Sequence, residues 1–261
     1  MRVFFIAWQD PESRSWRPVG RLTFDNETYK FVYTKGALTR NFIPFGFMHD
    51  LHSSYESPTL FPLFTNRLLT KNRPEYNEFL NWLNLTPDGD NSASQLALTG
   101  GIRGTDSLMV FPLPEPQSNH TYYVQFLCHG IRYLAEEAQK LIAQLKPGTR
   151  LYPMFDVQNM ADPSAISMRT EPAMIIGYIP RYFVHDIRIL LSTGQEDSAR
   201  IFVEKVNPDA PVQFKLLCSF TSNWPKGFRP FSGSLFQPID QERRRDKKLS
   251  EMGKIKNPRK R

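Results

Sequence analysis

Hydrophobic and polar positions alternate in short runs through the first part of the chain. The runs RVFFIAW, VGRLTF and TYKFVYT are rich in β-branched and aromatic residues, and polar turn segments at 11–16 and 25–27 separate them. Short apolar runs bounded by turn residues are typical of antiparallel strands. The pattern therefore predicts three antiparallel strands within residues 1–35.

The periodicity changes to a helical one further along the first half. Tyr76, Phe79, Leu80 and Leu83 lie three and four residues apart, and Pro74 suits a first helical turn, so a helix is predicted over 73–85. A second helix is expected over 92–98, because a glycine pair follows it. Residues 36–66 have no regular pattern, and 107–113 are expected to form a closing strand.

The second half follows a proline-rich linker at 114–120. Short apolar runs predict strands at 122–134, 150–155, 165–169, 173–179, 199–206 and 212–220. A helix is expected over 180–192, and 135–145 is either a helix or a long connection. The expected class is α+β, with two small β-rich domains at 1–116 and 117–222 and a flexible tail at 223–261.

The basic character of the chain comes from its last residues. The net charge is +7; residues 1–117 carry −1, residues 118–239 carry +2 and residues 240–261 carry +6. Ten cations within 22 residues favour an arm that contacts nucleic-acid phosphates, although a tail that only aids solubility is the alternative. Because the folded part is nearly neutral, any anion-binding site on it must be a local patch.

Composition also excludes several classes of protein. The chain has no run of about 20 apolar residues, so no transmembrane helix is expected. The apolar run at 3–8 is too short for a secretory signal and is expected to form the first strand. Cys128 and Cys218 lie in apolar runs, which predicts two buried thiols and a reducing cytoplasm rather than a disulfide framework.

Strong catalytic motifs are missing from the sequence. It contains no GxxxxGK[ST] phosphate loop, no HExxH, no CxxC and no GxSxG. Asp156 and Asp162 flank one polar turn and could hold Mg²⁺ or Mn²⁺ together with water. The alternative is that both carboxylates only bond to the backbone of their own turn.

Three segments of the second half carry a family resemblance. HGIRYL (129–134), DVQNMADPSAISM (156–168) and IIGYIPRYFVHDIRILL (175–191) occur in this order. Together they resemble the HIRAN domain, which occurs fused to DNA-remodelling ATPases and in bacterial proteins. The resemblance implies an OB-like β-barrel that binds single-stranded DNA at a 3′ end.

The resemblance also implies roles for individual residues. Arg132 matches the arginine that contacts a phosphate, and Tyr133 matches the aromatic that stacks on a base. Asn159 and Asp162 match turn residues that reach the terminal nucleotide and its 3′ hydroxyl. Tyr178 and Arg181 match the segment that holds the DNA backbone.

The turn departs from the family pattern at two positions. The family's NPYD motif reads NMAD here, so Ala161 replaces a second stacking tyrosine. Ser164 replaces the asparagine that precedes Ala-Ile in the family. A weaker clamp on the 3′ end, or a different ligand, is therefore expected.

The first half resembles the N-terminal subdomain of HipA-type toxins over about residues 1–115. The matching segments are VGRLTF with YKFVYT, ESPTLFPLFTNRLL and SQLALTGGIRGTDSLMVFPLP. No kinase catalytic loop follows, so no protein kinase activity is expected. The layout is similar to HipH-type proteins, which implies a toxin–antitoxin or defence module and a HipB-like helix-turn-helix antitoxin as partner.

Three hypotheses about function remain open from the sequence. The protein is a DNA-acting toxin, a non-catalytic module that binds DNA ends, or a subunit that binds only other proteins. If it is a metal-dependent deoxyribonuclease, Asp156, Asp162 and His129 are the candidate catalytic residues, and the two aspartates are the candidate metal ligands.

Overall fold

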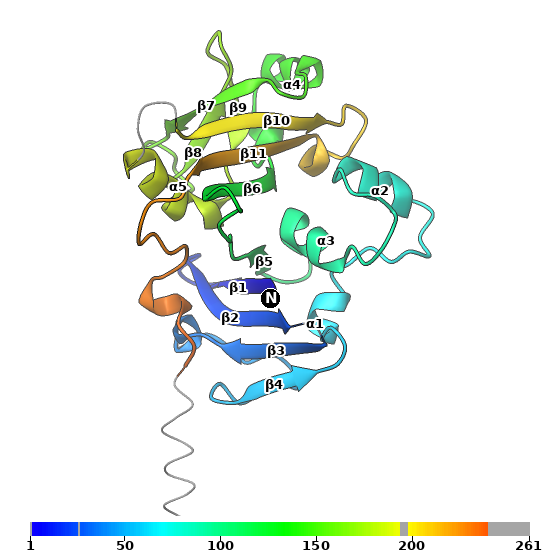
Figure 1. The fold of residues 1–261 in the computed structure, drawn as a ribbon, viewed down its shortest axis with the longest axis vertical. Coiled ribbons are helices and arrows are strands. Elements are labelled where there is room, and N and C mark those ends of the chain that lie inside the picture. Colours follow the sequence, from blue (N-terminus) through cyan, green and yellow to red (C-terminus); the bar gives the residue numbers. More distant parts are fainter. Residues whose placement is uncertain (1, 26, 194–197, 240–261) are drawn as a thin grey trace, which may run out of the picture.

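The computed structural model describes residues 2–25, 27–193 and 198–239 and contains two antiparallel sheets (Figure 1). The first sheet has the order β4-β3-β2-β1-β5. Its strands are β1 (Arg2–Gln9), β2 (Trp16–Asp25), β3 (Thr28–Tyr33), β4 (Ser54–Ser57) and β5 (Leu108–Pro112). The three strands predicted within residues 1–35 and the closing strand are therefore confirmed.

Three helices belong to the first half: α1 (Pro62–Thr65), α2 (Tyr76–Trp82) and α3 (Ser92–Thr99). The helix predicted over 73–85 is shorter than expected: it begins at Tyr76, after Pro74, and ends at Trp82. The four apolar residues that predicted this helix are all buried. As predicted, α3 ends at a glycine: Gly100 has a φ of 67°, a left-handed conformation that glycine adopts without steric cost.

The second half forms a curled sheet of six strands with the order β6-β11-β10-β7-β8-β9. The strands are β6 (Thr121–Leu127), β7 (Arg150–Phe155), β8 (Ile166–Arg169), β9 (Ile175–Tyr178), β10 (Arg200–Val206) and β11 (Leu216–Asn223). The accompanying helices are α4 (Glu136–Gln144), which settles the open alternative for 135–145, and α5 (Arg181–Thr193). The mostly-β architecture predicted for this half is confirmed.

The two edge strands of the curled sheet meet just beyond the end of β6. His129 and Tyr178 form an isolated antiparallel bridge with N–H···O distances of 3.0 and 2.9 Å. The strand predicted over 122–134 is therefore too long: Gly130 turns the chain with a φ of 80°, and a short 3₁₀ helix, η2 (Ile131–Tyr133), follows. We call this meeting of residues 129–133 with β9 the barrel seam.

Hydrophobic packing joins the two halves. Phe5 and Phe111 of the first sheet belong to the same buried cluster as the interior of the curled sheet. The Phe111 ring also stacks on Tyr182 of α5 at 4.9 Å. On another side, α2 and α3 pack against Leu127 and Leu217. The proline-rich linker at 114–120 therefore connects two sheets that share buried surface.

The expected tail does not begin at residue 223. Phe231 and Ile239 are buried, and the Ile239 amide donates to the Tyr33 carbonyl at 3.0 Å. Residues 223–239 therefore run back along the first sheet, because their aromatic and apolar side chains complete its packing (Figure 1). The cation-rich segment 240–261 lies outside the described residues.

Both cysteines are buried and free, as predicted. Burial raises the pKa of the Cys128 thiol to about 12, so this thiol stays protonated and behaves as an apolar side chain. Among the residues with a described placement, none of the helices has the length and apolar character needed to cross a bilayer.

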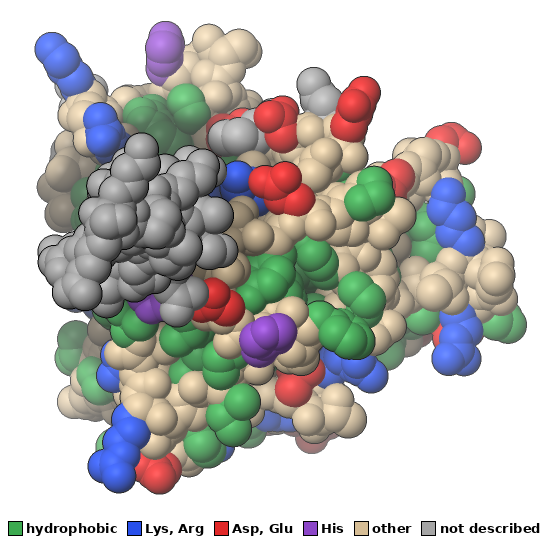
Figure 2. All heavy atoms as spheres, turned by 90° about the horizontal axis from the view of Figure 1, so that it is seen from below, with side chains coloured by type: hydrophobic (Ala, Val, Ile, Leu, Met, Phe, Trp, Pro, Cys, Tyr) green, Lys and Arg blue, Asp and Glu red, His purple; other side chains and the backbone are tan. Residues whose placement is uncertain are grey.

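The first half exposes apolar side chains in the segment between β3 and β4. Leu38, Ile43 and Phe47 have exposed fractions of 57%, 82% and 91%. Figure 2 views the molecule from below and shows hydrophobic side chains on the face that the first half presents there. We call Leu38, Ile43 and Phe47 the apolar patch.

Candidate nucleic-acid interface

The barrel seam depends on a close approach between Gly130 and Tyr178. A Cβ atom at Gly130 would lie 2.8 Å from the Tyr178 ring, so only glycine lets the chain pass here. The Tyr178 hydroxyl then donates to Asp156 Oδ2 at 2.9 Å. Burial and this carboxylate raise the pKa of Tyr178, which keeps the phenol protonated as a donor.

Hydrogen bonds within residues 156–165 define the turn that follows β7. Asn159 Nδ2 donates to Asp156 Oδ2 at 3.1 Å. Asn159 Oδ1 accepts the N–H groups of Ala161 and Asp162 at 3.0 and 3.1 Å. Asn159 therefore holds the turn in one shape, and its side-chain groups already have protein partners.

Arg181 connects the first turn of α5 to the turn at residues 156–165. Its Nε lies 2.7 Å from Asp162 Oδ2, and its guanidinium also donates to the Ala161 carbonyl at 3.0 Å. Asp162 Oδ1 accepts the Ser164 N–H at 3.0 Å. A continuous set of contacts thus runs from Tyr178 through Asp156, Asn159 and Asp162 to Arg181. The structure brings these five predicted residues together.

Arg132 and Tyr133 lie on the outer side of the seam. The Tyr133 side chain is 76% exposed. The Arg132 guanidinium lies over its ring at 4.6 Å from the centroid and donates to its hydroxyl. This pair offers a flat aromatic surface beside a cation, a combination suited to a nucleotide base and its phosphate.

Further pairs of arginine and aromatic side chains, which the sequence did not indicate, lie on the adjoining strands. Arg188 of α5 covers the half-exposed ring of Phe155 at 4.4 Å. Arg150 and Arg169 each lie 5.1 Å from the Tyr152 ring. Arg169 and Arg188 come from other elements than the rings that they cover, so only strand register and helix docking could reveal these pairs. Arg150 and Tyr152 lie two residues apart on β7, and the sequence signal was limited to the two aromatics of RLYPMF.

His129, Asp156 and Asp162 are the candidate catalytic residues. Asp156 accepts two side-chain donors, and Asp162 is paired with Arg181. Burial lowers the pKa of His129 to about 4, which makes its imidazole a weak general base near neutral pH. Over the described ranges, no three His, Cys, Asp or Glu side chains lie close enough to hold a metal ion. The cleavage hypothesis, with Mg²⁺ or Mn²⁺ at Asp156 and Asp162, stays a prediction.

Comparison with known proteins identifies the second half. Residues 121–222 match the HIRAN domain family, and this part of the chain is a HIRAN domain. A crystal structure of a protein from Lactobacillus plantarum is 20% identical, with 40% of this chain and 99% of that chain covered and a TM-score of 0.31. The HIRAN domain of human HLTF is 12% identical, with 41% and 84% covered and a TM-score of 0.30. No curated protein matches the chain.

Proposed function

We propose that this protein binds DNA at the barrel seam of its HIRAN domain, with a preference for single strands or 3′ ends. The observation that carries the proposal is the exposed Tyr133 ring, over which the Arg132 guanidinium lies. A base that stacks on an aromatic ring contributes about 1–3 kcal/mol, and a neighbouring arginine adds a phosphate contact. Because the folded part carries little net charge, such a local site fits the composition better than a broad electrostatic surface.

The turn at 156–165 supports the same proposal by holding its side chains in place before a ligand arrives. Asn159 and Asp162 already have protein partners, so a terminal nucleotide would meet a turn of defined shape. Ala161 is exposed where a second stacking ring would be expected. At the seam, the single ring of Tyr133 therefore carries most of the base contact.

Tyr133→Ala is expected to raise the dissociation constant for single-stranded DNA by about tenfold to a hundredfold, because the stacking surface is lost. Fluorescence anisotropy with labelled oligonucleotides that end in a free or a phosphorylated 3′ hydroxyl measures this change. Arg132→Ala is expected to weaken binding and to lower its dependence on salt.

The control for these variants is Tyr123→Ala, an exchange of the same kind on β6 away from the turn. A chain that ends at residue 239 separates the seam from the cation-rich segment. If binding disappears with that segment and Tyr133→Ala has no effect, the proposed site is wrong. Incubation of the same samples with Mg²⁺ or Mn²⁺, followed by a denaturing gel, tests cleavage.

We further propose that the first half docks a helix-turn-helix antitoxin of the HipB type, as part of a HipA-like toxin–antitoxin module. The apolar patch supports this, because its three large apolar side chains come from one segment and are mostly exposed, and exposed apolar surface is typical of protein interfaces. In co-expression with the product of the adjacent gene, Phe47→Ser is expected to abolish co-purification, because Phe47 is 91% exposed and has the most surface to bury. Ile102→Ser, at another exposed apolar position, serves as the control. Equal recovery with Phe47→Ser would contradict this docking role.

A further inference from the structure

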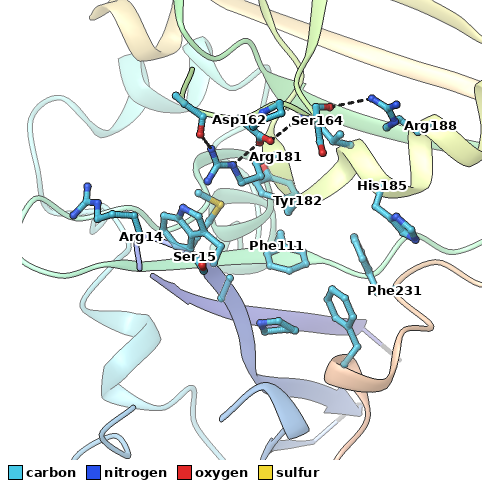
Figure 3. Close-up of a pocket in the computed structure, with 18 of the residues that line it drawn as sticks. Arg14, Ser15, Phe111, Asp162, Ser164, Arg181, Tyr182, His185, Arg188 and Phe231 are labelled. Atoms are coloured by element: carbon cyan, nitrogen blue, oxygen red, sulfur yellow. Dashed lines mark hydrogen bonds and ion pairs between the residues drawn. The ribbon is translucent and has the colours of Figure 1, made fainter. Parts of the chain in front are cut away.

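A cavity of about 610 Å³ lies where the two halves of the molecule meet (Figure 3). The loop between β1 and β2 forms one wall, and the turn before β8 together with the start of α5 forms the other. Phe231 and Phe236, from the segment that follows β11, close a third side. Neither half alone would form this space.

The cavity is lined by aromatic rings and by more cationic than anionic groups. Arg14, Arg181 and Arg188 line it, and the carboxylate of Asp162 is already paired with Arg181. The stacked rings of Phe111 and Tyr182 lie between the walls, with Phe231 edge-on to Phe111 at 5.2 Å. Apolar rings beside arginines suit a ligand that is both flat and anionic.

The wall from the first half is held in a defined conformation. Asp10 Oδ1 accepts the Glu12 N–H at 2.9 Å, and the Asp10 amide donates to the Ser15 carbonyl at 2.9 Å. The side-chain amide of Gln9 donates to the Arg14 carbonyl at 3.0 Å. This bond holds the backbone of Arg14, which has a φ of 58°, where its residue lines the cavity. The lining is therefore largely formed before any ligand binds, which lowers the entropic cost of binding.

The cavity shares two residues with the candidate DNA site. Asp162 and Arg181 line the cavity, and the same two residues end the set of contacts that begins at Tyr178 in the seam. Figure 3 shows Arg181 and Asp162 on the HIRAN side, with Arg14 and Ser15 across from them on the first-half side. Asp162 and Arg181 therefore belong both to the cavity and to the set of contacts that begins at the seam.

We propose that this cavity binds a nucleotide of the same DNA strand that the seam holds, with residues of the first half as part of the site. The proposal rests on the proposed DNA binding of the HIRAN domain and extends it. Trp16 and the rings of the cavity offer surfaces for the base, and Arg14 and Arg188 offer cations for the phosphate. The volume lies within the range of about 300–1,000 Å³ that is usual for small-ligand sites.

The test compares Arg14→Asn with Arg103→Asn in the full chain. Asparagine tolerates the positive φ at residue 14, so this exchange removes the cation with little strain. Arg103 is an exposed arginine of the first half outside the cavity. Arg14→Asn is expected to weaken binding of an oligonucleotide several-fold and to reduce the salt slope by about one, while Arg103→Asn leaves both unchanged.

Tryptophan fluorescence gives a second, independent readout. Trp16 lines the cavity, and a base that enters is expected to quench its emission. Trp16→Phe, which keeps an aromatic ring in the packing, should remove this quenching while binding at the seam continues. A free deoxynucleotide monophosphate is added in a parallel titration, and the oligonucleotide should quench at far lower concentration.

The outcomes separate the two proposals. If Arg14→Asn binds DNA like the wild type, with the same salt slope, while Tyr133→Ala weakens binding, the cavity proposal is overturned and the seam remains. Quenching by the free nucleotide but not by the oligonucleotide would also overturn it. If the wild-type chain binds no single-stranded DNA, the proposed function itself fails.

Discussion

Gly177→Ala is expected to lower the free energy of unfolding by more than about 3 kcal/mol, the largest loss among the variants considered. Gly177 has a φ of 142°, a region that residues with a side chain rarely adopt. An added Cβ would overlap Cys128 Sγ and lie 2.8 Å from the His129 carbonyl oxygen. Both neighbours belong to the segment that closes the barrel, so relief of the overlap requires the seam to open.

Gly148→Ala is the matched control for this variant. Gly148 also has a positive φ, of 83°, but an added Cβ would meet nothing within 4 Å. The Gly148→Ala exchange is therefore expected to lower the free energy of unfolding only through backbone strain, by about 1–2 kcal/mol. Chemical denaturation of both variants measures the difference. Equal losses would show that the approach of Gly177 to Cys128 and His129 does not matter for stability.

Asp186→Asn is expected to stabilise the protein at alkaline pH and to have little effect in acid. Asp186 is buried in α5, and this burial raises the pKa of its carboxyl from 3.8 to about 7, although the Phe231 N–H opposes the shift. The folded state therefore holds a proton that the unfolded state releases between pH 3.8 and about 7. The stability that this proton supplies is complete below pH 3.8 and is lost as the pH rises through about 7.

The expected difference between the two chains follows from this shift. At 1.36 kcal/mol for each pH unit, the variant should exceed the wild type by up to about 4 kcal/mol above pH 7. Asparagine keeps an acceptor for the Phe231 N–H, so the packing of residues 223–239 is retained. Because His129 is present in both chains, its own titration cancels in the comparison.

Thermal denaturation of both chains from acid to alkaline pH measures the effect. Asp209→Asn, at an exposed position, is the matched control and should follow the wild-type pH profile. A stability difference between Asp186→Asn and the wild type that stays constant across the pH range would contradict a raised pKa at Asp186.

The elements of this fold were largely predictable because they depend on local patterns. The strand at 150–155 has the predicted bounds, and α3 ends at the predicted glycine. Errors arose where a tertiary contact overrides the local pattern. The apolar run at 122–134 predicts one long strand, yet the chain turns at Gly130 because Tyr178 lies against it. Likewise, Phe231 and Ile239 carry no periodicity of their own, so their burial could not be foreseen.

The candidate site, like the fold, could be predicted only in part from the sequence. The residue types and their order allowed Arg132, Tyr133, Asn159, Asp162, Tyr178 and Arg181 to be selected from the sequence. Their connections could not be predicted, because Tyr178 and Asp156 lie 22 residues apart and meet only when the sheet curls. The pairs of arginine with Phe155 and Tyr152 were missed for the same reason. The HipA-like character of the first half stays a prediction.

The sequence by itself determined the β-rich elements and the buried thiols, and the resemblance of three short motifs indicated the HIRAN domain and the candidate residues of its site. These features follow from hydrophobic periodicity, turn residues and short motifs, which act over a few neighbouring positions. The tertiary structure alone decided the barrel seam, the shared core and the cavity between the halves. Those depend on contacts such as Phe111 with Tyr182, which join residues far apart in the chain and form only when both sheets pack together.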